Sequence, residues 1–395
     1  MHVSRTPRPS LCFTGDAVSL YSSRLDAEAL IVGGGPAGAA AACQLARRGR
    51  SVMLLEQSSG PAHKVCGEFL SAEAAVYLGE LGVELGRLGA LPIRGLQLST
   101  GRSQIATEIP FPAFSLSRLR LDEELLAQAL HSGAVVQRGQ RVESLTRQSG
   151  VWHAVLTNGF TVKAGAAFLA TGKHDLRGHP RPNHHTREFV AFKMYWRLDP
   201  SKQRELEQRV ELHFFPGGYA GLQLNEKGEA NLCVVVRWSL MRQCGSQWPV
   251  LLQWILRHAE PLAHRLDGAS SLFQRPLAIS SIPYGLLRVR SDHGLWLLGD
   301  QTAVIPSFAG DGISIALHSA RMACESFCGN GTPDDLARIM HRQLKRPFHI
   351  AAALAFVING VPEITGIARL WPQVLQIVAN ETRIPRTALF LPSIG

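Results

Sequence analysis

ALIVGGGPAG, residues 29–38, is the stretch of this chain that decides its fold. Its four leading apolar residues predict a short buried strand, and the glycines predict a tight turn into a helix from Ala39 to Arg48. Residues 51–55, SVMLL, predict a second buried strand, which ends at Glu56. A strand, Gly-x-Gly-x-x-Gly, a helix, a strand and an acid in this order form the dinucleotide-binding fingerprint.

Each position of the glycine turn has a physical task. Gly33 permits the tight turn, Gly35 lets the backbone approach a pyrophosphate, and Gly38 lets the helix pack close to the sheet. Pro36 and Ala37 lie between them at the helix N-terminus, where free N–H groups and the positive dipole end attract phosphate. We therefore expect this turn to bind the phosphates of a dinucleotide.

The acid at the end of the second strand restricts the nucleotide. Glu56, which follows Gly33 by 23 residues, can accept hydrogen bonds from both ribose hydroxyls, and Gln57 follows it into the same site. A carboxylate here repels a 2′-phosphate, so the predicted nucleotide is the adenosine diphosphate part of FAD or NAD and not of NADP. The fingerprint alone does not separate FAD from NAD.

Composition excludes several classes of protein. The chain has 395 residues, of which 46% are hydrophobic and 18% charged, and this balance excludes a disordered protein. The length predicts two domains or one large enzyme with an insertion. The net charge of +10 is spread along the chain without a run of five like charges, so we expect no nucleic-acid partner.

Cysteine and hydropathy patterns bear on location. Seven scattered cysteines argue against a disulfide framework and for a reducing compartment, so the sequence predicts a cytoplasmic protein. Two pairs of residues could begin a metal site, Cys324 with Cys328 and His184 with His185. No further metal ligands lie at a suitable spacing from either pair, so no bound metal is expected. No apolar stretch reaches the ~20 residues that span a bilayer. Residues 1–26 are predicted to be a loose leader, and the apolar segment 349–360 leaves peripheral membrane contact open.

Three later segments of the sequence extend the expected nucleotide site. A helix is expected to begin within residues 116–125, LSRLRLDEEL, and residues 167–172, AFLATG, predict a strand. Residues 294–300, GLWLLGD, predict a strand whose terminal Asp300 can bind ribityl hydroxyls. The following PSFAGDG, residues 306–312, lets backbone lie against an isoalloxazine ring, and the next helix points its positive end at the side of the ring that gains negative charge on reduction.

With these blocks in this order, the sequence resembles the family that joins aromatic-hydroxylating (group A) flavin monooxygenases to geranylgeranyl reductases. The resemblance implies FAD bound by an α/β, Rossmann-like domain that is split in sequence, with an inserted β-sheet substrate domain and a helical C-terminal tail. The expected divisions are a leader at 1–26, the first part of the FAD-binding domain at 27–175, the substrate domain at 176–289, the last part of the FAD-binding domain at 290–330 and C-terminal helices at 331–395.

The same resemblance implies roles for single residues. Arg118 of the Ser-Arg-x-x-Leu-Asp segment is expected to reach back to the flavin, Val142 to meet the adenine, and the Ala-Thr-Gly tripeptide to close the nucleotide site from the opposite side. Beyond the glycine turn and its acid, the expected cofactor-binding residues are Cys66, Gly67, Arg118, Val142, Ala170, Thr171, Gly172, Gly299, Asp300, Pro306, Gly310, Asp311, Gly312 and Ile313.

Three segments bear on the reaction. KVCGE, residues 64–68, is similar to the Lys-x-Cys-Gly segment of geranylgeranyl reductases, where the cysteine lies near the flavin. Three roles are therefore open for Cys66: a hydrogen donor to the substrate, a residue of the cavity wall, or an inert loop thiol. PGGY, residues 216–219, is similar to the same group, but Gly, Gln and Leu replace the Trp, Phe and Pro that follow there, which opposes a geranylgeranyl substrate. The Asp-Gly motif of the hydroxylases is broken in residues 173–178, KHDLRG, whose basic side chains either attract a nicotinamide nucleotide or are merely solvated.

The function predicted from the resemblance is NAD(P)H-driven monooxygenation of a hydrophobic phenolic or polyketide-like molecule through a flavin C4a-hydroperoxide. One alternative is reduction of carbon–carbon double bonds in an isoprenoid or lipid, and another is a halogenase-like or non-catalytic flavin-binding protein. Paired tryptophans of the halogenases are absent. A cavity face in the substrate domain is expected to include Tyr219 and Met194, with Trp196, Phe214 and Leu222 as further candidates. The oligomeric state is left open.

Overall fold

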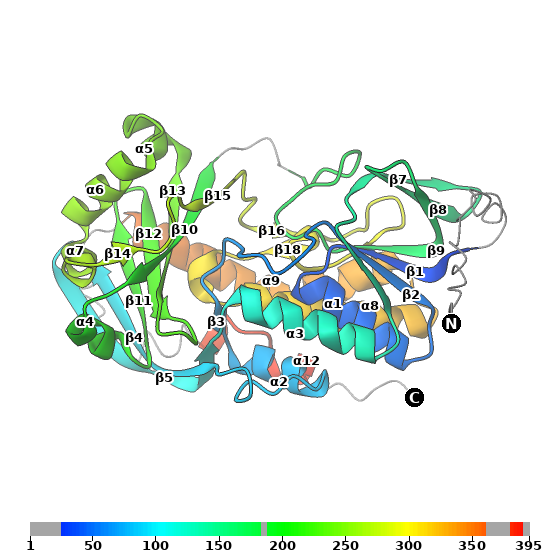
Figure 1. The fold of residues 1–395 in the computed structure, drawn as a ribbon, viewed down its shortest axis with the longest axis horizontal. Coiled ribbons are helices and arrows are strands. Elements are labelled where there is room, and N and C mark those ends of the chain that lie inside the picture. Colours follow the sequence, from blue (N-terminus) through cyan, green and yellow to red (C-terminus); the bar gives the residue numbers. More distant parts are fainter. Residues whose placement is uncertain (1–24, 183–187, 361–379, 390–395) are drawn as a thin grey trace, which may run out of the picture.

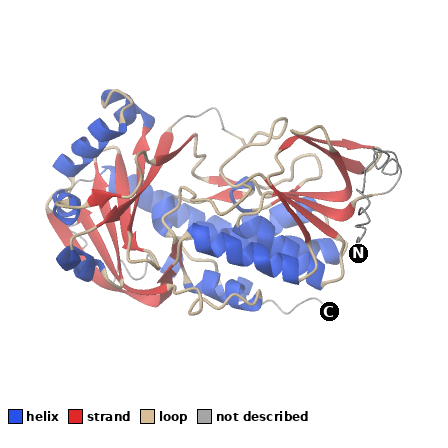
Figure 2. Ribbon diagram, in the orientation of Figure 1, coloured by secondary structure: helices blue, strands red, loops and turns tan. Residues whose placement is uncertain are grey.

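Two β-sheets lie at opposite ends of an elongated molecule, and long helices run along one side of the first sheet and toward the second (Figures 1 and 2). The computed structural model describes residues 25–182, 188–360 and 380–389. The predicted leader up to residue 24 and the pair His184-His185 therefore lie outside the described residues.

The first sheet contains the fingerprint. Its strands are β1 (Ala27–Val32), β2 (Val52–Glu56), β6 (Val135–Arg138), β7 (Val142–Gln148), β8 (Val151–Leu156), β9 (Thr161–Leu169) and β17 (Trp296–Leu297). Their order is β6-β2-β1-β9-β8-β7, and β17 pairs with β9. Strands β6, β2, β1, β9 and β17 run parallel, so their carboxyl ends meet at one edge of the sheet, where ligands of such folds bind.

Helices cover one face of this sheet (Figure 1). They are α1 (Pro36–Arg47), α2 (Ala72–Glu80), α3 (Arg118–His131), α8 (Gly312–Cys328) and α9 (Pro333–Gly360). Helix α1 begins at Pro36, earlier than the predicted Ala39, because proline is well suited to the first turn of a helix. The run Ala39–Ala42 is completely buried, and these small side chains let α1 pack closely between the sheet and the other helices.

The second sheet is built mainly from the middle of the chain. Its strands are β3 (Phe69–Leu70), β4 (Leu91–Thr100), β5 (Ser103–Ser115), β10 (Phe189–Arg197), β11 (Arg209–Phe215), β12 (Gly218–Leu224), β13 (Ala230–Arg237), β14 (Ser270–Ser271) and β15 (Leu277–Ser280). The order is β14-β10-β13-β12-β11-β4-β5-β3, and β15 also pairs with β10. Residues 69–115, within the range expected for the FAD-binding domain, thus supply three strands of this sheet.

Short elements complete the molecule. One face of the second sheet packs against apolar side chains of α5 (Trp238–Gln243), α6 (Trp248–His258) and α7 (Glu260–Leu266), and α4 (Pro200–Leu206) lies beside β11 and β12. The other short elements are β16 (Leu286–Leu287), β18 (Ala303–Val304), the 3-10 turns η1 (Gly299–Gln301) and η2 (Ser307–Ala309), and α12 (Arg386–Leu389). Within the described residues, the tail beyond residue 331 contains α9, with Pro347 inside it, and α12.

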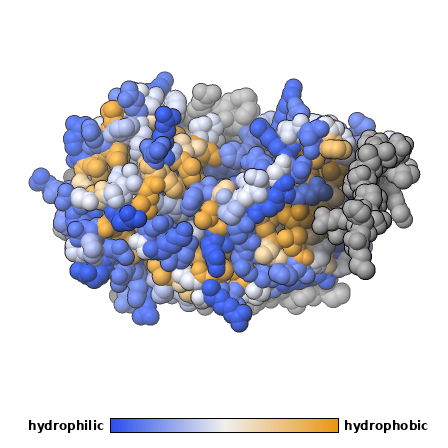
Figure 3. Space-filling view, viewed as in Figure 1, coloured by the Kyte–Doolittle hydropathy of each residue, from blue (hydrophilic) through white to orange (hydrophobic). Residues whose placement is uncertain are grey.

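Two features are absent from the described residues. In residues 25–182, 188–360 and 380–389, no helix has the length and apolar character needed to cross a membrane. Over the same ranges, no group of three or more His, Cys, Asp or Glu side chains is arranged to hold a metal ion. Figure 3 shows hydrophilic residues over much of the viewed face, with hydrophobic residues in separate patches.

Candidate functional site

A single cavity of about 1500 Å³ extends from the carboxyl ends of the parallel strands to the near face of the second sheet. Small-molecule pockets usually measure about 300–1,000 Å³, so this cavity has room for a dinucleotide and a further ligand. Most of the residues expected to bind the cofactor line it. They are Gly33, Gly35, Pro36, Ala37, Glu56, Gln57, Cys66, Gly67, Arg118, Val142, Ala170, Thr171, Gly172, Gly299, Asp300, Gly310, Gly312 and Ile313.

The glycine turn brings the N-terminus of α1 to the cavity wall. Gly33 has a φ of 107°, and a Cβ at this position would lie 2.5 Å from the carbonyl oxygen of Ala170. A Cβ on Gly38 would lie 1.9 Å from the carbonyl oxygen of Gly33. Only glycine fits at either position. Gly38 does not line the cavity and instead allows the close packing of helix on strand that the sequence predicts.

Glu56 closes one end of the cavity as an ionised group. Its carboxylate accepts the backbone N–H of Gly34 at 2.7 Å and that of Ser58 at 2.9 Å, and Lys64 Nζ lies 4.0 Å away. Burial alone would raise the pKa of Glu56, but the N–H groups of Ser58 and Gly34 outweigh burial and lower it. The carboxylate is therefore charged at neutral pH and can accept further hydrogen bonds from a ligand's hydroxyls.

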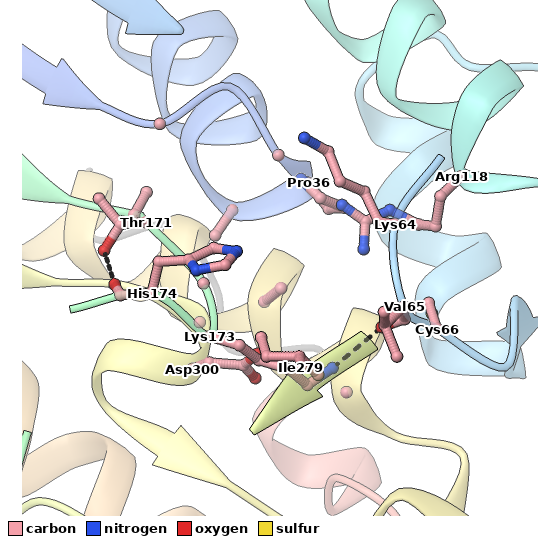
Figure 4. A pocket seen from close by; sticks show the side chains of 18 of the residues that line it. Pro36, Lys64, Val65, Cys66, Arg118, Thr171, Lys173, His174, Ile279 and Asp300 are labelled. Atoms are coloured by element: carbon pink, nitrogen blue, oxygen red, sulfur yellow. Dashed lines mark hydrogen bonds between the residues drawn. The ribbon is translucent and has the colours of Figure 1, made fainter. Parts of the chain in front are cut away.

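Arg118 stands at the start of α3 and faces the glycine turn (Figure 4). Its guanidinium bonds Asp122 in a bidentate pair, with Nε–Oδ1 at 2.7 Å and Nη2–Oδ2 at 2.8 Å. Burial would lower the pKa of Arg118, but Asp122 outweighs burial and raises it. A fixed cation thus lies where the Ser-Arg-x-x-Leu-Asp resemblance expects one.

The opposite end of the cavity is formed by the segment after β17. Asp300 lines the cavity from η1, and Gly310 has a φ of 77° in the turn before α8. A Cβ on Gly310 would lie 2.8 Å from Cδ1 of Phe69, so a larger residue would displace that ring. Next to it, the hydroxyl of Tyr284 and Oγ of Ser307 share a hydrogen bond of 2.7 Å.

A buried polar cluster behind the Cys66 loop was missed by sequence reasoning. Glu68 is completely buried in a left-handed backbone conformation with a φ of 65°. Its carboxylate pairs with the ammonium of Lys193 and accepts hydrogen bonds from the Tyr195 hydroxyl at 2.7 Å and from the Arg118 backbone N–H at 2.8 Å. Burial raises the pKa of Glu68, and the ammonium of Lys193 opposes that shift.

The cluster fixes the position of Cys66. Nδ2 of Asn231 donates to the carbonyl oxygens of Cys66 at 3.1 Å and Gly67 at 3.0 Å, and also contacts the Glu68 carboxylate. The backbone N–H of Glu68 points at Cys66 Sγ, 3.3 Å away. One sequence signal was available, since Lys193 is a lone charge in the middle of an apolar strand, and a buried charge requires a partner.

Some expected residues lie elsewhere. Pro306 does not line the cavity, and Asp311 is buried with its carboxylate 2.7 Å from Nη1 of Arg383. Met194 was expected on the cavity face but lies on the opposite face of β10, with Val190 and Phe192, because side chains alternate along a strand.

The same alternation corrects further expectations. Trp196 and Leu222 pack with the α5–α7 side of the sheet and not with the cavity side. Tyr219 is on the cavity side but does not line the cavity, because its ring packs against Phe214 and Phe308 at centroid distances of 5.8 and 5.7 Å.

Comparisons with known proteins agree with this geometry. Residues 26–166 match the family model described as an FAD binding domain. A menaquinone reductase of Mycolicibacterium smegmatis is 26% identical over 354 residues, which cover 84% of this chain and 85% of the relative. These similarities support an FAD-dependent oxidoreductase.

Solved structures show that this FAD-dependent oxidoreductase shares the fold of that group. The flavin-dependent brominase Bmp2 superposes with a TM-score of 0.72 at 16% identity, covering 90% of this chain and 93% of the brominase. A geranylgeranyl bacteriochlorophyll reductase-like protein of Thermoplasma acidophilum gives a TM-score of 0.67 at 18% identity, covering 92% and 94%.

The residues present in the oxidoreductase fit FAD. The Gly33 turn packs directly against the backbone of Ala170 and brings the N-terminus of α1, which has no side-chain cap, to the cavity, and Glu56 retains lone pairs for ribose hydroxyls. Glu56 and Val142 lie in one part of the cavity lining, and Asp300 and Gly310 in another, so a long dinucleotide has polar partners along its length. These residues would hold the cofactor, which supplies hydride-transfer chemistry when bound.

Proposed function

We propose that this FAD-dependent oxidoreductase reduces a carbon–carbon double bond in a hydrophobic substrate of the isoprenoid or isoprenoid-quinone class. The observation that carries the proposal is the shape of the cavity. Beyond the Cys66 loop it continues along an apolar wall of the second sheet, formed by Ala191, Val235 and Ile279, with Ile282 and Val304 beside them. An apolar molecule can therefore lie next to the residues that would hold the flavin.

Two hydrogens must reach the double bond, one as a hydride and one as a proton. Bound FAD would supply the hydride after reduction by a donor of the NAD(P)H class. Cys66 is the group of this chain that we assign to the proton, because its thiol lines the cavity between the cofactor residues and the apolar wall. The hydrogen bonds from Asn231 and Glu68 hold the loop that carries it.

The relatives support the same class of substrate. Menaquinone reductases of two mycobacterial species match 84% of this chain at 26–27% identity. The broken hydroxylase motif after Gly172 and the Cys-Gly pair at 66–67 point in the same direction.

Monooxygenation of an aromatic compound is the second candidate, and one observation favours it. Phe214, Tyr219 and Phe308 form an aromatic cluster beside the segment that would face the flavin ring. None of the three rings lines the cavity, so the cluster would support the wall beside an aromatic substrate and would not stack on it. In that reaction the chain would position the substrate carbon and exclude water from the apolar part of the cavity.

One experiment separates the two reactions. The FAD-loaded protein is reduced with dithionite without oxygen, incubated with menaquinone, and then exposed to air before mass analysis, so that any reversible reduction of the quinone ring is undone. We expect a product that has gained two hydrogens. Cys66→Ala should slow its formation by roughly tenfold to a thousandfold, the range of general acid catalysis. Cys328→Ala, which changes a thiol of α8 outside the cavity lining, is the matched control.

Two outcomes would contradict the proposal. A phenolic substrate that gains one oxygen atom only in aerated reactions with NAD(P)H, while menaquinone is left unchanged, would establish the second candidate instead. Equal rates for the Cys66→Ala variant and the unmodified protein would remove the assigned proton donor.

A further inference from the structure

Lys173 extends into the cavity from the turn that ends β9 (Figure 4). Three contacts hold the backbone of this turn. The buried Gln301 donates from Nε2 to the carbonyl oxygens of Gly172 at 2.8 Å and His174 at 3.0 Å, and Oγ1 of Thr171 donates to the carbonyl oxygen of His174 at 2.6 Å. The backbone on both sides of Lys173 is therefore fixed, and the direction of its side chain is set by the fold.

The Lys173 ammonium crosses the cavity toward the Cys66 loop. Its Nζ donates to the carbonyl oxygen of Val65 at 3.3 Å. Burial would lower the pKa of Lys173, but the Asp300 carboxylate, followed by Cys66 and Tyr284, outweighs burial and raises it. The group is charged at neutral pH.

The surroundings of this charge place it at the end of the cavity opposite Glu56. Asp300 and Cys66 come from segments expected at the flavin ring, and Tyr284 bonds Ser307 of the segment between β18 and α8. A second cavity lysine, Lys64, lies at the other end, 4.0 Å from Glu56 and 3.3 Å from Ser58 Oγ. The cavity thus has one lysine near the ribose acceptor and one near the expected ring position.

We propose that Lys173 is the residue that tunes the reduction potential of the bound flavin. Reduction by two electrons places negative charge on the N1 side of the ring, whereas the oxidised ring is neutral. A fixed ammonium at that end of the cavity stabilises the reduced ring more than the oxidised one, because only the reduced ring carries a negative charge for it to attract. This inference rests on FAD binding alone and holds for either reaction proposed above.

Reduction potential is the measurement that tests the assignment. The FAD-loaded proteins are titrated anaerobically against a reference dye, with dithionite as the electron source, and the dissociation constants of oxidised and reduced FAD are measured separately. The variants are Lys173→Met, which removes the charge, Lys173→Gln, which keeps a donor for the Val65 carbonyl, and Lys173→Arg, which keeps the charge. Lys64→Met is the matched control at the ribose end.

In Lys173→Met and Lys173→Gln we expect reduced FAD to bind about tenfold more weakly relative to oxidised FAD, which for a two-electron couple lowers the potential by about 30 mV. Lys173→Arg should retain the potential of the unmodified protein. Lys64→Met should weaken both redox forms alike and leave the potential unchanged. The assignment is overturned if the Met and Gln variants keep the original potential, or if the Arg variant shifts as far as they do.

Discussion

Glu56 carries its charge into a mostly buried position, with 8% of its surface exposed, because two backbone N–H groups stabilise the ionised form. The same carboxylate is the predicted acceptor for the ribose hydroxyls. The Glu56 side chain thus holds the turn before α1 and is expected to bind the ribose of the nucleotide. Its loss should affect both the turn and nucleotide binding.

Replacing this acid tests its role directly. We expect Glu56→Lys to weaken FAD binding by roughly tenfold to a hundredfold, the range for losing hydrogen bonds to a charged group. The ratio of flavin to protein absorbance after purification, and a fluorescence titration of the apoprotein with FAD, give the measurement. Glu84→Lys, an exposed acid far from the cavity lining, serves as the control. Full retention of FAD in Glu56→Lys would refute the role of this carboxylate.

Lys193 and Glu68 form the second residue-scale test. In Lys193→Met the Glu68 carboxylate is left buried without its cation, which typically costs about 3–5 kcal/mol of unfolding free energy. The double variant Glu68→Gln/Lys193→Met removes both charges and should be less destabilised than Lys193→Met alone. Urea unfolding of the unmodified protein, Lys193→Met, Glu68→Gln and the double variant supplies the comparison. A double variant as unstable as the sum of the two single variants would show that the charges do not interact.

The sequence signals only that Lys193 needs a buried partner, and it does not show which residues form the cluster. Glu68, Lys193 and Asn231 are far apart in the chain, and Glu68 has a backbone conformation that usually favours glycine. They meet because the loop before β3 packs Glu68 onto the adjacent strands β10 and β13 of the second sheet. The fingerprint was predictable for the opposite reason, since its strand, turn, helix and acid are consecutive and each step has a local physical requirement.

Helix α1 depends on the absence of one methyl group. A Cβ on Gly38 would lie 1.9 Å from the Gly33 carbonyl oxygen, and the backbone there has no room to move aside. We expect Gly38→Ala to lower the unfolding free energy by about 3 kcal/mol or more, measured by thermal or urea unfolding. Gly79→Ala in α2 adds the same methyl group with no atom within 4 Å and should leave stability unchanged or raise it by up to about 1 kcal/mol. Similar stability for both variants would contradict the packing argument.

The strands of the β4–β5 hairpin were not predicted from the sequence. Strand β5 alternates regularly between its faces, but one face is partly exposed, and Pro110 and Pro112 interrupt the pattern. Proline normally argues against a strand and is tolerated at edges and bulges. These prolines occupy a stretch of β5 that is not paired with β4, next to the register shift between Ile93 and Gly95. Strands β10, β11 and β13 were predicted because they are rich in apolar residues and no proline interrupts them.

At the scale of the whole molecule, the C-terminal segment is tied to the cavity end of α8. Arg383 bonds Asp311 at 2.7 Å, lies 3.8 Å from Glu73, and stacks on the ring of Phe111 at 4.0 Å from its centroid. Burial raises the pKa of Asp311 to about 7, against the pull of Arg383. A residue from the end of the chain therefore influences the charge at the start of the helix that follows the Gly310 turn.

This raised pKa has a defined effect on stability. A folded-state pKa above the unfolded value means that the folded protein binds the proton more tightly, so the contribution is present at low pH and is lost as pH rises through about 7. Relative to Asp311→Asn, the unmodified protein should lose up to about 4 kcal/mol between about pH 4 and pH 8. Melting temperatures of both proteins across that range provide the check. A constant difference, or one that grows in favour of the unmodified protein with rising pH, would contradict it.

The route of the chain through the second sheet limits how the protein can be divided. Strand β11 pairs in parallel with β4, which precedes α3 in the chain, so the sheet draws on two separate stretches of sequence. Helix α3, strand β6 and the β7-β8-β9 meander of the first sheet lie between these stretches. A gene fragment cut at residue 176 would leave β4 and β5 behind with an unpaired edge. A transfer of the second sheet to another protein must therefore move both stretches together, because a single crossover point would separate β4 from its partner β11.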